Sequence, residues 1–228
     1  MACAAALAQA GAHVVLVART VTEIASVASE IEREGGRAEA LALDVTDLPA
    51  VRSGIGAQAP FDILVNNAGT NRPAPFLEVS EEDYDAITTL NQRAAFFVAQ
   101  AVARRMVEAG KGGSIIHMSS QMGHVGGARR TVYCMSKHGI EGLTKAMAID
   151  LAPYHIRVNS IGPTFIDTPL TRPFWHDKVF HADVVSRIKL GRLGTVEDLM
   201  GSVVFLASDA AAMITGTSLV VDGGWTAE

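Results

Sequence analysis

The chain has 228 residues, of which 49% are hydrophobic and 19% charged, and its formal net charge at pH 7 is −5. This length supports one sizeable core, and no repeat, low-complexity stretch or Pro/Ser-rich linker marks a boundary, so we expect a single domain over residues 1–228. The acidic balance and scattered arginines argue against a nucleic-acid partner, and no apolar run is long enough to predict a membrane span.

The first twenty residues predict the back end of a strand–helix–strand unit. Residues 3–10 are alanine-rich, Gly11 is a helix stop signal, and His13–Val17 is a β-branched apolar run. The stretch Ala-Leu-Ala-Gln-Ala loosely resembles a signal-peptidase site, but a signal peptide needs a basic segment before its apolar part. Because the first arginine is Arg19, beyond the supposed cleavage point, the signal-peptide reading is the weaker one.

Strands and helices alternate along the whole chain. The six predicted strands are His13–Val17, Ala38–Leu43, Asp62–Val65, Ser114–Met118, Ile156–Ser160 and Ser218–Val221. Most are short continuous apolar runs, which is typical of strands covered on both faces. The alternation predicts an α/β fold with a doubly wound parallel sheet, the Rossmann fold.

Three helices carry start signals. Thr20 and Glu23 have capping-box spacing, Ser80 precedes three acids in the first turn of a long helix to about Ala109, and Thr195–Asp198 opens another helix. Ligands bind doubly wound sheets at the carboxyl ends of the strands, so we expect functional side chains just after each strand.

Two strand ends carry residues suited to a ligand. Asn66-Asn67-Ala68-Gly69 follows the third strand, and its small residues let the backbone approach a ligand, although an ordinary turn favours the same residues. Ser119-Ser120 follows the fourth strand.

Tyr133 and Lys137 are four residues apart and share one face of a predicted helix. An ammonium close to a phenol favours the phenolate and lowers a pKa that starts near about 10. Such a tyrosine can donate and accept a proton at neutral pH. The alternative is a surface lysine that packs its stem on the tyrosine ring.

In combination, these residues resemble the short-chain dehydrogenase/reductase family. Asn66–Gly69, Asn91, Ser120, Tyr133 and Lys137 appear in the family's order, and the resemblance extends from residue 1 to the terminal Ser-Leu-Val-Val-Asp-Gly-Gly-Trp. It implies an NAD(P)-dependent oxidoreductase that interconverts a secondary alcohol and a ketone by hydride transfer.

The resemblance implies a role for each of four residues. Tyr133 would give the proton in reduction and remove it in oxidation, while Lys137 would lower the pKa of Tyr133 and bind the nicotinamide ribose. Ser120 would hold the substrate oxygen beside Tyr133. Asn91 matches the asparagine that joins a water chain to the lysine, at a mid-helix position where asparagine is intrinsically unfavourable.

The resemblance also implies a cofactor site. Its residues would be Arg19, Asp44, Val45, Asn67, Ala68, Gly69, Tyr133, Lys137, Ile166 and Thr168. Asp44 and Val45 match the pair that recognises adenine, although Asp44 could instead be a loop carboxylate near the next helix. The Ile166 backbone and the Thr168 hydroxyl would meet the carboxamide and phosphates, and Thr164 replaces the family's glycine.

The end of the first predicted strand bears on the choice of cofactor. A carboxylate there would bind the 2′-hydroxyl of NAD, but the chain has Ala18 followed by Arg19. Arg19 could pair with a 2′-phosphate, so we expect NADP, with NAD as the alternative.

Residues 164–194 match the segment that covers the substrate in the family. Its polar and aromatic residues include Thr171, Arg172, Phe174, Trp175, His176, Phe180 and His181. This mixture suits a sugar, polyol or sugar acid better than a 3-oxoacyl thioester. Outside this segment, Gln121 directly follows Ser120 and could hydrogen-bond a substrate hydroxyl. Phe174 and Trp175 could equally pack the lid on the core or contact another subunit. The last helix and strand resemble those of the family's tetramer, so a homotetramer is expected.

Cysteine and histidine give no sign of a disulfide or metal. Cys3 and Cys134 lie in no CxxC or zinc spacing, and the seven histidines form no HExxH pattern. We expect a reduced, cytoplasmic protein with no metal site.

The family's Thr-Gly-x-x-x-Gly-x-Gly turn, with the strand before it, would lie upstream of Met1. That strand would be central, flanked by His13–Val17 and Asp62–Val65, and its absence would leave two strand edges unpaired. We therefore expect the true polypeptide to begin about twenty residues earlier. The alternative is a truncated, non-catalytic remnant that serves as a scaffold or inactive partner subunit. The chain nevertheless retains all four expected catalytic residues, which a remnant would not require: Ser120, Tyr133, Lys137 and Asn91.

Overall fold

The computed structural model describes residues 1–169 and 171–228 and confirms the α/β class. The strands are β1 (His13–Ala18), β2 (Arg37–Ala42), β3 (Ile63–Asn66), β4 (Gly113–Met118), β5 (Ile156–Pro163) and β6 (Ser218–Val221). The helices are α1 (Ala2–Gln9), α2 (Val21–Arg33), α3 (Leu48–Ala57), α4 (Glu81–Thr88), α5 (Ala95–Ala109), α6 (Thr131–Leu151), α7 (Lys178–Arg187) and α8 (Glu197–Ala207).

The parallel strands form two sheets. One pairs β1 with β2, and the other has the order β3-β4-β5-β6. The division lies between β1 and β3, the two strands expected to flank a strand upstream of Met1. Within the described residues, each of these strands therefore has one edge without a strand partner.

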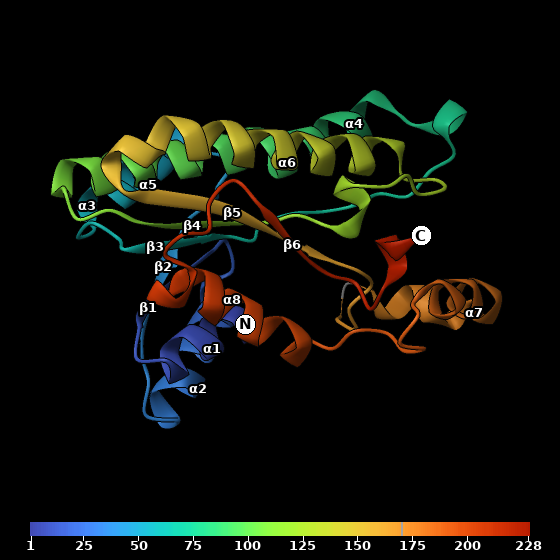
Figure 1. Ribbon diagram of the computed structural model, residues 1–228, viewed down its shortest axis with the longest axis horizontal. Coiled ribbons are helices and arrows are strands. Elements are labelled where there is room, and N and C mark those ends of the chain that lie inside the picture. The colour runs from blue at the N-terminus through green and yellow to red at the C-terminus, as the bar shows by residue number, and fades with distance from the viewer. Residues whose placement is uncertain (170) are drawn as a thin grey trace.

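Helices cover both faces of the strands (Figure 1). Helices α3, α4, α5 and α6 lie on one face, and α1, α2 and α8 lie on the other. The strands of the larger sheet run toward α7 and the carboxyl terminus, so the ends expected to carry functional residues meet the lid segment there.

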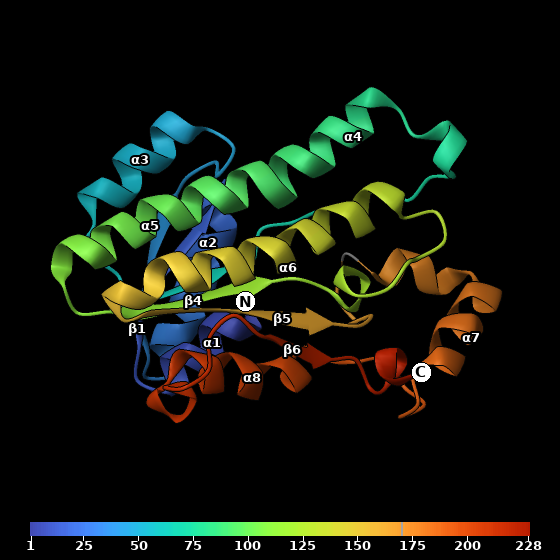
Figure 2. The same ribbon diagram turned by 45° about the horizontal axis from the view of Figure 1, so that its top comes forward.

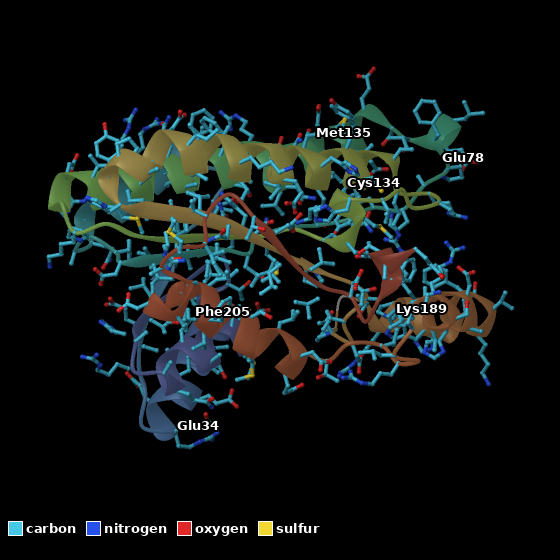
Figure 3. All side chains as sticks on the ribbon, viewed as in Figure 1. Glu34, Glu78, Cys134, Met135, Lys189 and Phe205 are labelled. Atoms are coloured by element: carbon cyan, nitrogen blue, oxygen red, sulfur yellow. The ribbon has the colours of Figure 1, made fainter. Side chains whose placement is uncertain are left out.

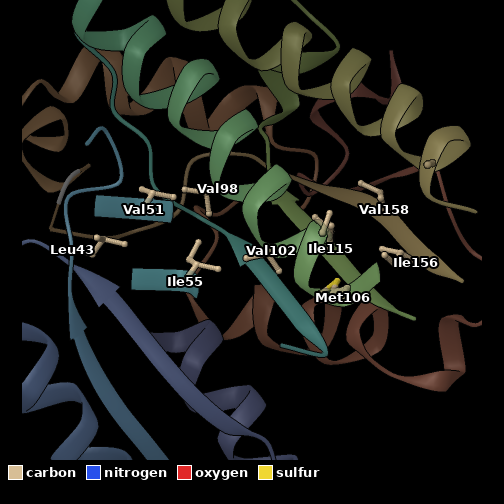
Figure 4. Close-up of a cluster of buried hydrophobic side chains, with 11 residues drawn as sticks. Leu43, Val51, Ile55, Val98, Val102, Met106, Ile115, Ile156 and Val158 are labelled. Carbon is tan, nitrogen blue, oxygen red and sulfur yellow. The ribbon is translucent and has the colours of Figure 1, made fainter. Parts of the chain in front are cut away.

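Three groups of buried apolar side chains hold these layers together. The group under α3 and α5 includes Val51, Val102, Met106, Ile115 and Val158, all at most 2% exposed (Figure 4). A second group packs α8 against the other face of β4 and β5. The third group, beneath β1 and β2, has only four buried members, all of them alanine or isoleucine.

The predicted long helix from Ser80 to Ala109 is three consecutive helical segments. Helix α4 passes into a π turn, Thr89–Ala94, which continues into α5 (Figure 2). Ser80 caps α4 as predicted, since its hydroxyl accepts a hydrogen bond from the Asp83 N–H. Thr20 also precedes a helix, but its exposed side chain makes no capping bond, so the predicted capping box is wrong in detail.

Helix α8 begins at Glu197, where the Asp198 carboxylate accepts a hydrogen bond from the Thr195 N–H. No helix among the described residues combines the length and apolar character needed to cross a bilayer.

Candidate active site

Tyr133 and Lys137 lie on one face of α6, as their spacing predicts. The Lys137 ammonium is 5.6 Å from the centre of the Tyr133 ring. It donates a hydrogen bond of 2.8 Å to the carbonyl of Met118, the last residue of β4. Lys137 is buried, which excludes the alternative of a surface lysine resting on a tyrosine ring.

Burial also shifts the charge state of Lys137. Loss of hydration lowers its pKa to about 8, although the nearby Glu141 carboxylate partly opposes this shift. The ammonium is therefore the main form at neutral pH.

The expectation that Lys137 lowers the pKa of Tyr133 needs correction. Burial is the largest influence on this phenol and raises its pKa, because a phenolate would lose hydration. The opposing influences come from the Ser120 side chain and the Arg130 guanidinium, while Lys137 uses its ammonium to bind a backbone carbonyl.

Ser120 is the second residue after β4, in the Ser119-Ser120 pair that was predicted to follow this strand, and it is buried. Its hydroxyl donates a 2.8 Å hydrogen bond to Gln121 Oε1 and accepts one from the Met122 N–H. Gln121 is itself only 2% exposed. It therefore orients Ser120, a role that the sequence analysis did not assign to it.

Asn91 lies in the π turn between α4 and α5 and is 1% exposed. Its Oδ1 accepts a 2.8 Å hydrogen bond from the Thr70 N–H, and its Nδ2 donates to the Thr70 carbonyl and to Ser136 Oγ. Asn91 thus ties the loop after β3 to α6. The irregular turn is what directs this side chain inward, and π turns are frequent at functional sites.

The loop after β3, residues 67–69, lies beside these groups and is called the cradle below. Asn67, Ala68 and Gly69 are exposed, whereas Asn66 is buried and donates to the Ala95 carbonyl. A side chain at Gly69 would stand 3.3 Å from Asn91 Oδ1 and 3.7 Å from Lys137 Nζ. Glycine therefore keeps open the space next to the lysine.

The residues predicted for the adenine end lie at the ends of β1 and β2. The Asp44 carboxylate accepts hydrogen bonds from the Thr46 N–H and hydroxyl, which lower its pKa. It is 4.0 Å from Arg19, whose side chain is 79% exposed. Val45 is half-buried and packs against the core under α3.

Ile166 and Thr168 follow β5. Ile166 is buried, and its carbonyl accepts a hydrogen bond from the Thr171 hydroxyl, which also lies 3.2 Å from the Thr168 hydroxyl. Thr164, which replaces the family's glycine, has a buried Oγ1 with no hydrogen-bond partner in the part of the chain that the structure describes.

The predicted lid includes a cluster of aromatic rings. Phe165 contacts Trp175, Phe180 and Trp225, with ring centres 5.7–6.0 Å apart. Phe174 contacts Phe180 at 6.5 Å. Phe174 and Trp175 thus pack against other rings of the lid segment itself.

Two further polar side chains lie near these groups and were not predicted from the sequence. Arg130, three positions before Tyr133, is buried against the rings of Phe165 and Phe174. Its spacing from Tyr133 was visible in the sequence, but the rings it contacts are distant in the chain.

His117, on β4, is 1% exposed, and neither ring nitrogen has a hydrogen-bond partner among the described residues. Burial, helped by the Lys137 charge, lowers the pKa of His117 to about 4.

Comparison with known proteins adds to this geometry. A family model described as enoyl-(acyl carrier protein) reductase matches residues 1–226. D-Erythrulose reductase of Gallus gallus is 40% identical over 222 residues, which are 97% of this chain and 89% of that reductase.

Two solved structures have the same fold. A short-chain type dehydrogenase/reductase from Mycobacterium marinum is 39% identical with a TM-score of 0.94, and the match covers 100% of this chain and 91% of that one. A gluconate 5-dehydrogenase from Burkholderia cenocepacia, in complex with NADP and tartrate, is 35% identical with a TM-score of 0.95, covering 100% and 90%.

Proposed function

Because the chain belongs to the short-chain dehydrogenase/reductase family, we propose that it interconverts a secondary alcohol and a ketone with NADP as the hydride carrier. The favoured substrates are sugars, polyols and sugar acids, in keeping with the names of its relatives. The observation that carries the proposal is the convergence of Ser120, Tyr133 and Lys137 beside the end of β4. A scaffold or inactive subunit would not require this arrangement.

We assign the proton transfer to Tyr133. Its hydroxyl would donate a proton to the substrate oxygen in reduction and remove one in oxidation. Ser120, oriented by Gln121, would hold that oxygen beside the phenol. The Lys137 ammonium, fixed on the Met118 carbonyl, would keep a positive charge close to the phenol and bind the cofactor ribose.

The residues around the cradle fit a nicotinamide cofactor. The space that Gly69 keeps open beside Lys137 and the unpartnered Thr164 Oγ1 can accept a polar group. When bound, the nicotinamide supplies or accepts the hydride. Asn67, Ala68 and Ile166 would line its site, Thr168 would contact its phosphates, and Asp44 and Val45 would hold the adenine.

Arg19 supports NADP over NAD. Its guanidinium is largely exposed and at the limit of ion-pair distance from Asp44, so it can turn toward a 2′-phosphate. NAD remains the alternative, since Asp44 lies close by.

Fluorescence titration with NADPH and NADH tests the cofactor assignment, and turnover of a panel of ketoses and keto acids tests the reaction. We expect saturable NADPH binding, weaker NADH binding, and loss of the preference in Arg19→Ala. If the protein bound neither nucleotide and reduced no member of the panel, the proposal would be rejected.

We also propose a homotetramer in the cytoplasm. Apolar side chains are exposed on both α5 and α6. Phe96 is 42% exposed and Ile149 is 76% exposed. Met135, labelled in Figure 3, is 42% exposed. These side chains offer a surface for a second subunit. The two cysteines, Cys3 and Cys134, are unpaired, as expected in a reducing compartment. Light scattering of the purified protein would test the tetramer.

A further inference from the structure

Arg130 is a buried cation close to the predicted site. It is 8% exposed and occupies the position just before α6, one turn from Tyr133. Its charge acts on the Tyr133 phenol, three positions further along the chain, so the guanidinium lies near the proposed proton donor.

Two rings of the lid segment hold the Arg130 guanidinium. Its central carbon lies 5.3 Å from the centre of the Phe165 ring and 5.5 Å from that of Phe174. Contacts of this kind attract a cation to the rings and restrict its motion. They do not occupy its N–H donors, which can bind the oxygens of water or of a ligand.

No anion compensates this charge in the part of the chain that the structure describes. The ionisable groups close enough to influence Arg130 are Tyr133, Cys134 and Arg129, none of which is a carboxylate. Other arginines do have carboxylate partners: Arg72 with Asp83, Arg105 with Glu108, Arg172 with Asp167, Arg187 with Asp183 and Arg192 with Asp198. All of these pairs are more exposed than Arg130.

A buried guanidinium without an anion is costly, so its presence beside a proposed catalytic group points to a ligand charge. A carboxylate matches the planar fork of arginine donors better than a hydroxyl does, because it can accept two parallel hydrogen bonds. A neutral polyol would leave the charge uncompensated.

We propose that Arg130 binds the carboxylate of the substrate, so that the site takes hydroxy acids and keto acids of the sugar-acid class in preference to neutral ketoses and polyols. This inference rests on the proposed oxidoreductase function and narrows its substrate class. Arg130 is one helical turn from Tyr133. A short substrate can therefore bind Arg130 with its carboxylate while its reacting carbon lies beside Tyr133.

Two measurements test the inference. The first is NADPH-dependent reduction of 5-keto-D-gluconate and of L-xylulose, which represent the charged and neutral classes. In Arg130→Met, we expect kcat/KM for the keto acid to fall about 10- to 150-fold, the range for a hydrogen bond to a charged group. The value for L-xylulose should fall by a clearly smaller factor, which reports only the loss of the Arg130 charge beside Tyr133. Arg130→Lys should restore part of the loss for the keto acid by retaining the charge.

The second measurement is binding without turnover. Trp175 and Trp225 both contact Phe165, so their fluorescence should report D-gluconate or tartrate entering next to Arg130. Titration should saturate with the unmodified protein, and the affinity should weaken in Arg130→Met. Arg129→Met is the matched control, because Arg129 is exposed and adjacent in sequence.

The outcomes separate the two proposals. Turnover of L-xylulose with equal or greater efficiency than 5-keto-D-gluconate would overturn the role of Arg130 and leave the oxidoreductase function intact. An equal loss of both activities in Arg130→Met, with D-gluconate affinity unchanged, would also overturn it. Absence of turnover with every substrate of the wider panel would instead count against the proposed function.

Discussion

Tyr133 is the side chain on which the proposed reaction depends. Tyr133→Phe removes only the hydroxyl and keeps the ring that faces Lys137. We expect turnover to fall at least about 100-fold, the usual size of a general acid–base contribution. The measurement is NADPH oxidation with a saturating ketone. Tyr84→Phe is the control, since Tyr84 is on α4 and 45% exposed. Undiminished turnover in Tyr133→Phe would contradict the assignment of proton transfer to Tyr133.

His117 should make stability depend on pH. Its pKa is lowered from 6.5 to about 4 in the folded protein, so between these values the unfolded chain binds the proton and the folded one does not. Stability attributable to His117 is therefore lost as the pH falls, by about 2 kcal/mol between pH 7 and pH 5.

Urea unfolding at pH 7 and pH 5 measures this loss. His117→Gln should reduce the difference between the two pH values by about 2 kcal/mol. His176→Asn should leave it unchanged, because His176 is exposed in the lid. An unchanged pH dependence in His117→Gln would show that His117 is already protonated or hydrated in the folded state.

At the scale of the helix, Ser80 and Thr20 occupy equivalent positions but differ in their contacts. Ser80 accepts a hydrogen bond from the Asp83 N–H, whereas Thr20 makes no capping bond. We expect Ser80→Ala to lower the free energy of unfolding by about 1 kcal/mol and Thr20→Ala to lower it by less than about half of that. Urea unfolding at one pH checks both variants, and equal losses would show that Thr20 caps its helix in solution.

The strands were predictable because buried parallel strands are short apolar runs between glycines and turns. The starts of β1 and β5, the end of β4 and both bounds of β6 coincide with the prediction. The other bounds differ by one residue, except the end of β5, which differs by three. The π turn at Asn91 was not predictable, since it depends on hydrogen bonds to Thr70 and Ser136, which are distant in sequence. Likewise, their spacing predicted that Tyr133 and Lys137 lie on one face of a helix. The sequence could not show that Arg130 contacts Phe165 and Phe174, because these contacts form only when the lid segment folds over Arg130.

At the scale of the whole molecule, the two sheets have different means of support. Strands β4 and β5 lie inside the larger sheet and are covered on both faces, and Ile115, Val158 and Ile161 are 0% exposed. Strands β1 and β2 rest on a small group of alanines and isoleucines, and Val17 of β1 is 40% exposed. The smaller sheet joins the rest partly through α1, whose Leu7 packs against the α8 group.

This difference predicts two levels of protection in amide hydrogen exchange. Regions with fewer buried apolar contacts open at lower free energy, so amides of β1 and β2 should exchange faster than those of β4 and β5. Leu7→Ala should speed exchange in the smaller sheet further and leave β4 and β5 near their original rates, because it removes a contact that holds α1 on α8. Exchange at one common rate in all of these strands would mean that the two sheets unfold as a single cooperative unit. In that case the division between β1 and β3 would have no energetic consequence.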